Sequence, residues 1–362
     1  MFAWPDGRTA LLCLSVRSAF DALLTTLELA AGSEIIFSAV NIDGMAQVAL
    51  AHGLALRTAD IALDTLAASP AAIVAAMTHN TRVVLVSHLY GASEQVDELA
   101  GLCRDREVLL VEDGAQAWSD QFRGSASADV SLFSFGPIKT ATALGGAVMV
   151  IREPARAQAL HALLGSYPEM PDSWFARRLV KYGMLRAASN ATLYAAVFRA
   201  LRFAGRHPDE TIAASARGFR DGALLPQLRK APPGRLLRMV ERRVTSVTAV
   251  PKRVRKAERF LNQLEVTTPG CRAFAHARWV TPILVDDPDR LISHLRPLGF
   301  DATRGATSLR ALQAAECPEA ARLMRHVVYM PSTTTMPDAE VDRLAVSINR
   351  WIATGQGAAL RP

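Results

Sequence analysis

Short apolar runs alternate with stretches of helical periodicity along the first 150 residues of this chain. The runs are short enough for β-strands and lie at residues 11–16, 34–40, 82–87, 107–112, 130–135 and 145–151. Between them, stretches such as residues 93–106 repeat apolar positions every three or four residues, which indicates amphipathic helices. Runs without polar alternation are typical of strands buried on both faces. This order predicts an α/β domain with a mostly parallel central sheet sandwiched by helices.

The remainder of the chain shows two different patterns. Residues 152–260 are helical in pattern and rich in arginine, whereas a second alternation of strands and helices begins near Trp279. The order strand–helix–strand–strand–helix suits a small α+β domain. We therefore expect a large domain over residues 1–250, with a basic helical insertion at about 165–230, and a smaller C-terminal α+β domain over residues 251–362.

Composition is typical of a globular, cytoplasmic protein. Half of the 362 residues are hydrophobic, no repeat is present, and the N-terminal segment lacks the basic residues that open a signal peptide. The longest apolar helical segment, between Arg186 and Arg199, is too short to cross a bilayer. The 4 cysteines are scattered without a Cys-x-x-Cys pair. We therefore expect reduced thiols and no metal site.

Positive charge is concentrated in one part of the chain. Residues 174–260 contain 20 Lys and Arg against 5 Asp and Glu, and the remainder contains 21 against 29. Within this part, residues 174–203 mix cations with aromatic and aliphatic residues at helical spacing. Three interpretations are open: a helical hairpin packed on the large domain or a dimer partner, a peripheral contact with an anionic membrane, or a positive field that attracts a phosphorylated substrate. No nucleic-acid-binding motif is recognisable, so nucleic acid is not an expected partner.

Polar residues follow three of the predicted strands at the point where each ends. His88 and Asp113 come directly after two apolar runs, and the loop after a third run carries Lys139. Gln116 lies three residues beyond Asp113, and Ser134 lies five residues before Lys139. Ligands of open α/β sheets bind beyond the carboxyl ends of the strands, so these side chains are candidates for one shared site.

A lysine, a carboxylate and a phosphate-binding loop together favour pyridoxal 5'-phosphate (PLP) as the cofactor. A lysine amine forms a Schiff base with the aldehyde of PLP, and an acidic partner such as Asp113 keeps the pyridine nitrogen protonated. The amine reacts well only when burial or a nearby cation lowers its pKa. A helix that begins near Arg17 and Ser18, together with the hydroxyl of Ser134, offers groups that bind a phosphate. Lys139 is then the expected nucleophile.

Three sequence motifs resemble those of the DegT/StrS-type aminotransferases. They are "SHLYG" at residues 87–91, "VEDGAQAW" at 111–118 and "SFGPIKTATALGGAV" at 134–148. The resemblance extends over nearly the whole chain, with a poor match at 152–250. It implies the architecture of fold-type-I PLP transferases and a transaminase of sugar biosynthesis that aminates keto groups, mostly on nucleotide-linked sugars. Lysine at position 139 indicates transamination, because a histidine there would suggest the dehydratase branch of the family.

The resemblance also implies a role for each matching residue. Lys139 corresponds to the Schiff-base lysine, Asp113 to the partner of the pyridinium nitrogen, and Gln116 to the residue that hydrogen-bonds the ring oxygen. Ser134 corresponds to a phosphate ligand, and His88 to a histidine at the edge of the active site. The implied partners are glutamate or glutamine as amino donor, a carbonyl compound as acceptor, and a second copy of the chain in a homodimer.

Two further residues are candidate substrate contacts. Tyr90 lies inside the first motif, and Arg304, in "DATRG", is a candidate partner for the carboxylate of the amino donor. Two alternatives to a nucleotide-linked keto sugar are open. One is an aminotransferase for a lipid-linked or other non-sugar carbonyl substrate at the membrane surface, and the other is a non-catalytic scaffold or regulator with the PLP fold.

The basic segment 174–203 motivates the membrane alternative, and the first two of the following departures from the family pattern motivate the scaffold alternative. Arg17 and Ser18 stand where the family has a small Gly-Thr or Gly-Ser pair for the phosphate. Residues 40–42 are Val-Asn-Ile where an aromatic residue that stacks on the cofactor is expected, and Leu144 replaces a glutamate before the glycine pair. The lysine chemistry is compatible with these departures, whereas the identity of the substrate depends on them.

Overall fold

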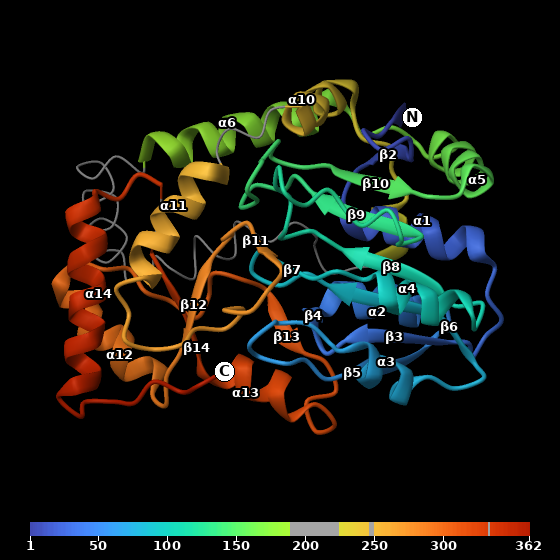
Figure 1. Cartoon of the computed structure of the whole chain (residues 1–362). Helices are drawn as coiled ribbons and strands as arrows, with labels where there is room; N and C mark the ends of the chain where they lie inside the picture. Colours follow the sequence, from blue (N-terminus) through green and yellow to red (C-terminus); the bar gives the residue numbers. More distant parts are fainter. Residues whose placement is uncertain (189–223, 246–249, 332–333) are drawn as a thin grey trace.

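The computed structural model describes residues 1–188, 224–245, 250–331 and 334–362. Its centre is an eight-stranded sheet with the order β1-β2-β10-β9-β8-β6-β3-β5 (Figure 1). The strands are β1 (Phe2–Ala3), β2 (Thr9–Cys13), β3 (Glu34–Ser38), β5 (Ala55–Ala59), β6 (Thr81–Ser87), β8 (Leu109–Asp113), β9 (Val130–Ser134) and β10 (Ala147–Ile151). The five neighbouring strands from β9 to β5 run parallel, and β10 runs antiparallel to both of its neighbours. The expected mostly parallel sheet is confirmed.

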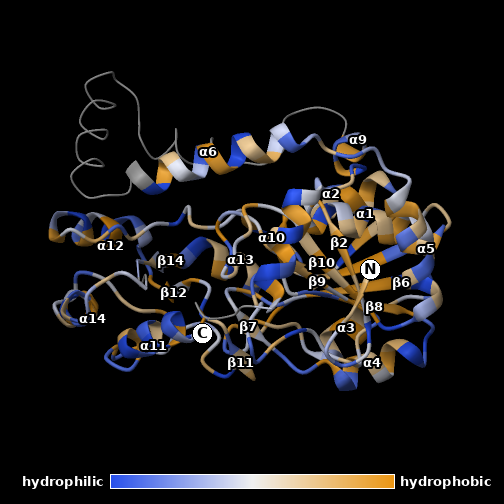
Figure 2. Cartoon of the chain, turned by 90° about the horizontal axis from the view of Figure 1, so that it is seen from above, coloured by the Kyte–Doolittle hydropathy of each residue, from blue (hydrophilic) through white to orange (hydrophobic). Residues whose placement is uncertain are grey.

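Helices cover both faces of the sheet, because alternate residues of each strand point to opposite sides. One face packs against α1 (Val16–Leu27), α2 (Asp43–Ala51) and α5 (Pro154–Gly165). The opposite face packs against α3 (Pro70–Ala76) and α4 (Asp97–Arg104) and, over β9 and β10, against α10 (Gly234–Thr245). Figure 2 shows hydrophobic residues concentrated in the central strands, while the outer helices alternate between hydrophobic and hydrophilic positions.

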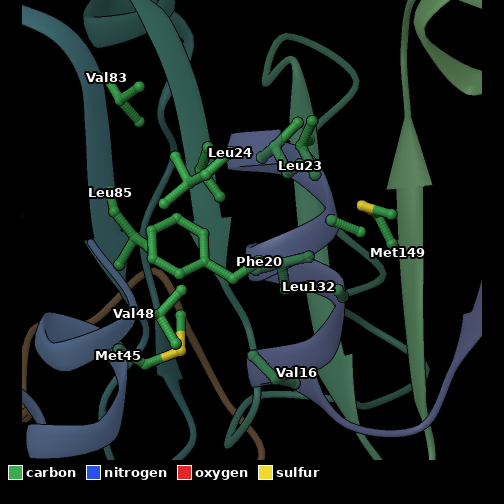
Figure 3. Close-up of a cluster of buried hydrophobic side chains, with 14 of the residues drawn as sticks. Val16, Phe20, Leu23, Leu24, Met45, Val48, Val83, Leu85, Leu132 and Met149 are labelled. Carbon is green, nitrogen blue, oxygen red and sulfur yellow. The ribbon is translucent and has the colours of Figure 1, made fainter. Parts of the chain in front are cut away.

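Helix α1 supplies the centre of one hydrophobic core. Its buried residues recur every three or four positions, so Val16, Phe20, Leu23 and Leu24 all face the sheet. Figure 3 shows the ring of Phe20 beside Leu85 of β6 and the side chains of α2. This packing fixes the axis of α1 and therefore the place where the helix begins.

The C-terminal elements gather on one side of the sheet (Figure 1). Helices α11 (Val250–Leu261), α12 (Pro288–Leu295) and α14 (Asp338–Ala353) surround a separate hydrophobic core with β12 (Thr281–Leu284) and β14 (Val327–Met330). A short 3-10 helix, η1 (Arg296–Leu298), follows α12. Strands β12 and β14 pair antiparallel, which agrees with the expected α+β order. The division of the chain at residue 250 stays a prediction.

Two short strand pairs join this C-terminal part to the segments that follow the central strands. Strand β13 (Leu309–Ala311) pairs with β4 (Val40–Ile42), and β11 (Ala275–His276) pairs with β7 (Ala92–Ser93). Helix α13 (Pro318–His326) shares a core with α3 and α4. Segments far apart in the sequence therefore meet near the carboxyl ends of β3 and β6.

Helices α6 (Asp172–Ala188) and α9 (Leu224–Leu228) belong to the basic middle part of the chain. Helix α6 runs along one edge of the molecule and contacts α10 (Figure 1). Most of the predicted insertion at 165–230, and the second half of the basic segment 174–203, lie outside the described residues. Within the described ranges, no helix combines the length and the apolar character that spanning a bilayer requires.

Candidate active site

Asp113 and Lys139 lie at the carboxyl ends of two neighbouring strands. Asp113 is the last residue of β8, and the adjacent strand β9 is followed by a loop of residues 135–146 that carries Lys139. The loop is closed at its base, where the N–H of Phe135 donates to the carbonyl of Gly146 at 3.0 Å. Because both ends of the loop are fixed to the sheet, the lysine is held near the carboxylate of β8.

Burial perturbs the pKa of both groups. The pKa of the half-buried Lys139 amine falls from 10.5 to about 8, because burial disfavours the ammonium form more than the charge of Asp113 favours it. Burial raises the pKa of Asp113. The N–H of Ala115 and the charge of Lys139 favour the carboxylate and oppose this rise, but burial is the larger effect. The site therefore combines an amine that loses its proton readily with a buried carboxyl group.

Asn41 holds the second oxygen of Asp113. The N–H of Ala115 donates to Asp113 Oδ1 at 3.1 Å, and Asn41 Nδ2 donates to Oδ2 at 3.4 Å and to Ser87 Oγ at 2.9 Å. Asn41 is only 2% exposed. In the sequence this position is notable only for the missing aromatic residue, and its contact with Asp113 is not predicted. A polar residue inside an otherwise apolar strand end is the signal that identifies it.

Trp279 covers the amine of Lys139 from the opposite part of the chain. The centroid of its ring lies 4.3 Å from Lys139 Nζ, and its Nε1–H donates to the carbonyl of Ile138 at 2.7 Å. In the sequence Trp279 marks only the start of a predicted strand. No local pattern reports this contact, because it joins residues about 140 positions apart.

The N-terminus of α1 lies beside the lysine loop, because the N–H of Gly146 donates to the carbonyl of Leu14 at 3.1 Å. Ser15 caps the helix, and its Oγ accepts from the N–H of Ser18 at 3.1 Å. Ser134 is partly exposed at the end of β9. Ser18 is buried and its Oγ lies 2.9 Å from Ser15 Oγ, so the helix N-terminus and the hydroxyl of Ser134 are the groups at this end of the sheet that suit a phosphate.

Arg17 is half-buried at the start of α1, in contact with α2. Burial lowers its pKa to about 10. A Cβ at Gly44 would lie 2.9 Å from Arg17 Cδ, so the absence of a side chain at Gly44 leaves the room that the arginine occupies. The arginine is therefore held between two helices at the sheet end.

Gln116 connects the loop after β8 to the turn after β6. Its Oε1 accepts from the N–H of Tyr90 at 2.7 Å, and the side chain is buried. Tyr90 has a φ of 57°, a strained conformation for a residue other than glycine. Gln116 thus stabilises the turn of the "SHLYG" motif, and its predicted contact with a cofactor ring stays a prediction.

The structure directs His88 and Tyr90 to partners other than Lys139. His88 Nε2 lies 3.0 Å from Glu112 Oε1, and consecutive residues of a strand such as Glu112 and Asp113 point to opposite faces of the sheet. The ring of Tyr90 is fully buried, and its hydroxyl accepts from that of Tyr329 at 3.2 Å. His88 still acts on Asp113, because its charge is among the causes that favour the carboxylate, and the predicted roles of His88 and Tyr90 stay predictions.

Arg304 is also engaged elsewhere. It is exposed, and its Nη2 donates to the carbonyls of Met324 and Arg325 at 3.3 and 2.9 Å. These carbonyls belong to the C-terminal turn of α13, where a cation is favoured by the helix dipole. The predicted contact with a donor carboxylate is not supported by this position.

Part of the chain is similar to known proteins of one family. Residues 8–171 match the DegT/DnrJ/EryC1/StrS aminotransferase family, which confirms the resemblance that the motifs indicated. A curated relative, the L-glutamine:2-deoxy-scyllo-inosose aminotransferase of Streptomyces fradiae, is 31% identical over 157 residues, or 42% of this chain and 37% of that protein. The chain spans about a third of the length of the curated relatives that it matches.

Solved structures resemble the fold over almost the whole chain. The aminotransferase TlmJ from Streptoalloteichus hindustanus aligns with a TM-score of 0.70 and 17% identity over 95% of this chain and 86% of that one. An E. coli GDP-4-keto-6-deoxy-D-mannose-3-dehydratase with bound hydrated PLP aligns with a TM-score of 0.67 and 15% identity over 93% and 87%. The expected architecture of fold-type-I PLP transferases is therefore confirmed.

Proposed function

We propose that this protein is a PLP-dependent aminotransferase that moves an amino group from glutamate or glutamine to a keto sugar. The observation that carries the proposal is the position of Lys139, with a pKa of about 8, near the buried Asp113 at neighbouring strand ends. The family match over residues 8–171 includes both groups and supports the same reaction. A nucleotide-linked keto sugar is the first candidate acceptor, because the family resemblance favours that class.

The residues of the site fit PLP. When bound, PLP supplies an aldehyde that a lysine amine takes up and a ring that accepts an electron pair from the substrate. Asp113 would hold the ring nitrogen, and Ser134 and the backbone N–H groups at the N-terminus of α1 would hold the phosphate. The amide of Asn41 and the N–H of Ala115 each bond one oxygen of Asp113, and a carboxylate oxygen can accept a second hydrogen bond from a cationic ring nitrogen.

Lys139 supplies the nucleophile and then a proton carrier. A fall of its pKa from 10.5 to about 8 raises the neutral fraction of the amine at pH 7 about 300-fold, to about a tenth of the molecules. A neutral Nζ attacks a carbonyl carbon, and the bond that forms releases water. When it is not bonded to the cofactor, the same Nζ would serve as the general base for the α-proton of the amino donor.

Asp113 sets the charge at the other end of the site. A carboxylate next to a pyridine nitrogen favours its protonated form, and each unit by which the nitrogen's pKa rises corresponds to about 1.4 kcal/mol. The N–H of Ala115 and the amide of Asn41 fix both oxygens, so the carboxylate needs little reorganisation to receive the ring.

The proposal is tested by covalent capture of PLP. The protein is incubated with PLP, reduced with borohydride and digested, and the modified peptide is identified by mass spectrometry. We expect the label on Lys139 and a visible absorption band that Lys139→Ala abolishes. Lys252→Ala, at an exposed position on α11, is the matched control and should keep both signals. A wild-type protein that takes up no PLP would refute the proposal and favour the scaffold alternative.

Transamination itself is tested by loading and discharge. The PLP-loaded protein is incubated with L-glutamate or L-glutamine, freed of the donor, and offered free and nucleotide-linked keto sugars in separate reactions. We expect the spectrum to change with one of the two donors, and the aminated product to appear with a nucleotide-linked sugar. No spectral change with any donor would count against transamination.

A second candidate substrate class is favoured by the surface of α6. Val180 is 61% exposed and Met184 is 63% exposed on a helix that also carries exposed arginines such as Arg177 and Arg186. An exposed apolar and basic helix favours contact with an anionic membrane, which would give access to a lipid-linked acceptor. Sedimentation with anionic vesicles at low salt tests this contact, and Val180→Asp with Met184→Asp should abolish it. A homodimer, which the family resemblance implies, is tested by analytical ultracentrifugation.

A further inference from the structure

Trp279 occupies a buried position directly over the reactive amine. Its side chain is 7% exposed, and its ring centroid lies 4.3 Å from Lys139 Nζ. The indole N–H donates to the carbonyl of Ile138, the residue immediately before the lysine, at 2.7 Å. One side chain therefore contacts both the amine and the backbone that carries it.

The backbone of Trp279 is fixed on the turn that follows β6. Its N–H donates to the carbonyl of Tyr90 at 3.0 Å, and its own carbonyl accepts from Arg253 Nη1 at 3.2 Å. Gly91 has a φ of 98°, and a Cβ there would lie 2.8 Å from the backbone nitrogen of Trp279. This close approach requires glycine, so the "SHLYG" turn is shaped to seat the tryptophan.

The strand that contacts Asp113 through Asn41 carries no aromatic residue that could perform this task. Residues 40–42, where an aromatic is expected, are Val-Asn-Ile, and Asn41 is engaged by Asp113 and Ser87. We propose, on the basis of the function proposed above, that Trp279 is a positioning residue of this site. Its indole excludes water from Lys139 Nζ, and its hydrogen bond to Ile138 ties the lysine loop to the segment after β11.

The ring has two opposing electrostatic effects on the amine. Contact with an aromatic face favours the ammonium form, whereas exclusion of water disfavours it. The pKa of Lys139 is lowered to about 8 with burial as the largest cause, although Asp113 opposes the shift, so exclusion of water dominates. Asp113 is the charged group that acts on the amine, while Arg253 contacts the backbone carbonyl of Trp279. Removal of the ring should therefore raise the pKa of Lys139.

The first experiment measures the amine without the cofactor. Cofactor-free protein is labelled with trace acetic anhydride at a series of pH values, and the label on Lys139 is quantified by peptide mass spectrometry. We expect a midpoint near pH 8 for the wild type. Trp279→Ala should shift the midpoint upward by about one unit, whereas Trp279→Phe, which keeps an aromatic cover, should leave it within a few tenths. Phe274→Ala, at a 64% exposed position of the same segment, is the control.

The second experiment distinguishes the effect of the aromatic ring over Lys139 from that of the hydrogen bond between Trp279 and Ile138. The rate at which borohydride-trapped PLP accumulates on Lys139 is compared in the same variants at pH 8. Trp279→Phe lacks the donor to Ile138, so we expect capture to slow about tenfold although the midpoint is unchanged. Far-ultraviolet circular dichroism checks that each variant folds, and Trp279→Phe keeps the comparison meaningful if Trp279→Ala does not fold.

The two proposals fail in different ways. Unchanged midpoints and unchanged capture rates in the Trp279 variants would overturn the role of this residue, while leaving PLP binding intact. A wild type that never captures PLP would refute the proposed function, while a shifted midpoint in Trp279→Ala would still support the contact with Lys139. A midpoint shift of equal size in Phe274→Ala would also overturn the proposal, because it would assign the effect to the whole segment.

Discussion

Replacement of Asn41 by leucine tests how the carboxylate of Asp113 is held. The side chains are similar in size, but leucine lacks the two polar atoms. Three hydrogen bonds are lost: to Ser87 Oγ at 2.9 Å, to Asp113 Oδ2 at 3.4 Å, and from the N–H of Ile42 at 2.7 Å. At about 1 kcal/mol each they sum to about 3 kcal/mol, and the apolar surface of leucine returns about 1 kcal/mol. We expect the free energy of unfolding to fall by about 2 kcal/mol at pH 7.

The pH dependence of this loss identifies its cause. Burial raises the pKa of Asp113 in the folded protein, and the Asn41 amide is one of the groups that oppose the rise. A carboxyl group with a raised pKa destabilises the folded state above that pKa, and the cost disappears as the pH falls through it. Loss of Asn41 raises the pKa further, so the deficit of Asn41→Leu should be largest at neutral pH and shrink in acid.

Asn349→Leu is the matched control for this measurement. Like Asn41, Asn349 accepts a backbone N–H, that of Glu265 at 3.2 Å, but it donates to the carbonyl of Gln263 at 2.7 Å, and no carboxylate side chain is among these partners. Urea unfolding of the wild type and both variants at pH 4.5, 6 and 8 compares the deficits. A deficit of Asn41→Leu that is the same at all three pH values would refute the idea that Asn41 supports a charged Asp113.

Three further perturbations have defined outcomes. Phe20→Ala removes a ring from the core beneath the sheet and should lower the free energy of unfolding in urea by about 3–5 kcal/mol, whereas Leu298→Ala, at an exposed position, should change it little. Gly91→Ala places a Cβ 2.8 Å from the backbone nitrogen of Trp279 and should slow the capture of PLP by Lys139. Gly101→Ala is the control, because a Cβ there meets open space, and it should leave the capture rate unchanged. Equal capture rates in the two variants would contradict the idea that Gly91 allows Trp279 to approach the turn. The hydrogen bond with Arg259 lowers the pKa of Asp342 to about 2. The ionised carboxylate therefore stabilises the folded state above the ordinary pKa of 3.8, and this stabilisation is lost as the pH falls toward 2. The thermal midpoint of Asp342→Asn should therefore lie below that of the wild type at pH 7 and approach it at pH 2; a constant difference would contradict this sign.

The sequence predicted the central strands well because their residues are buried on both faces. The runs at 82–87 and 130–135 correspond closely to β6 and β9. Strand β5 was missed, because it lies at the edge of the sheet and its residues are largely half-exposed, which leaves no apolar run to detect. A run of apolar residues indicates a buried strand, so a half-exposed edge strand cannot be recognised from this pattern.

The candidate site was predicted as far as each residue's place along its strand allowed. Lys139 and Asp113 follow neighbouring strands, and the topology brings them together. His88 follows its strand equally closely, yet the alternation of side chains places it with Glu112 on the other face. Trp279 belongs to a distant segment, and the pairing of β11 with β7 together with its own hydrogen bond to Tyr90 places it there. Contacts of this range have no signature in a single sequence.

The pairing of β13 with β4 has a consequence for the order in which the protein is completed during synthesis. Strand β4 carries Asn41, and its partner residues 309–311 are translated when most of the chain already exists. Until then β4 presents an open edge, and unpaired edges invite association with other chains. A nascent chain of residues 1–250 contains every strand of the central sheet but lacks both the strand that pairs with β4 at Asn41 and the tryptophan above the lysine. Reactivity of the amine toward aldehydes should therefore arise late, after the last quarter of the chain has left the ribosome.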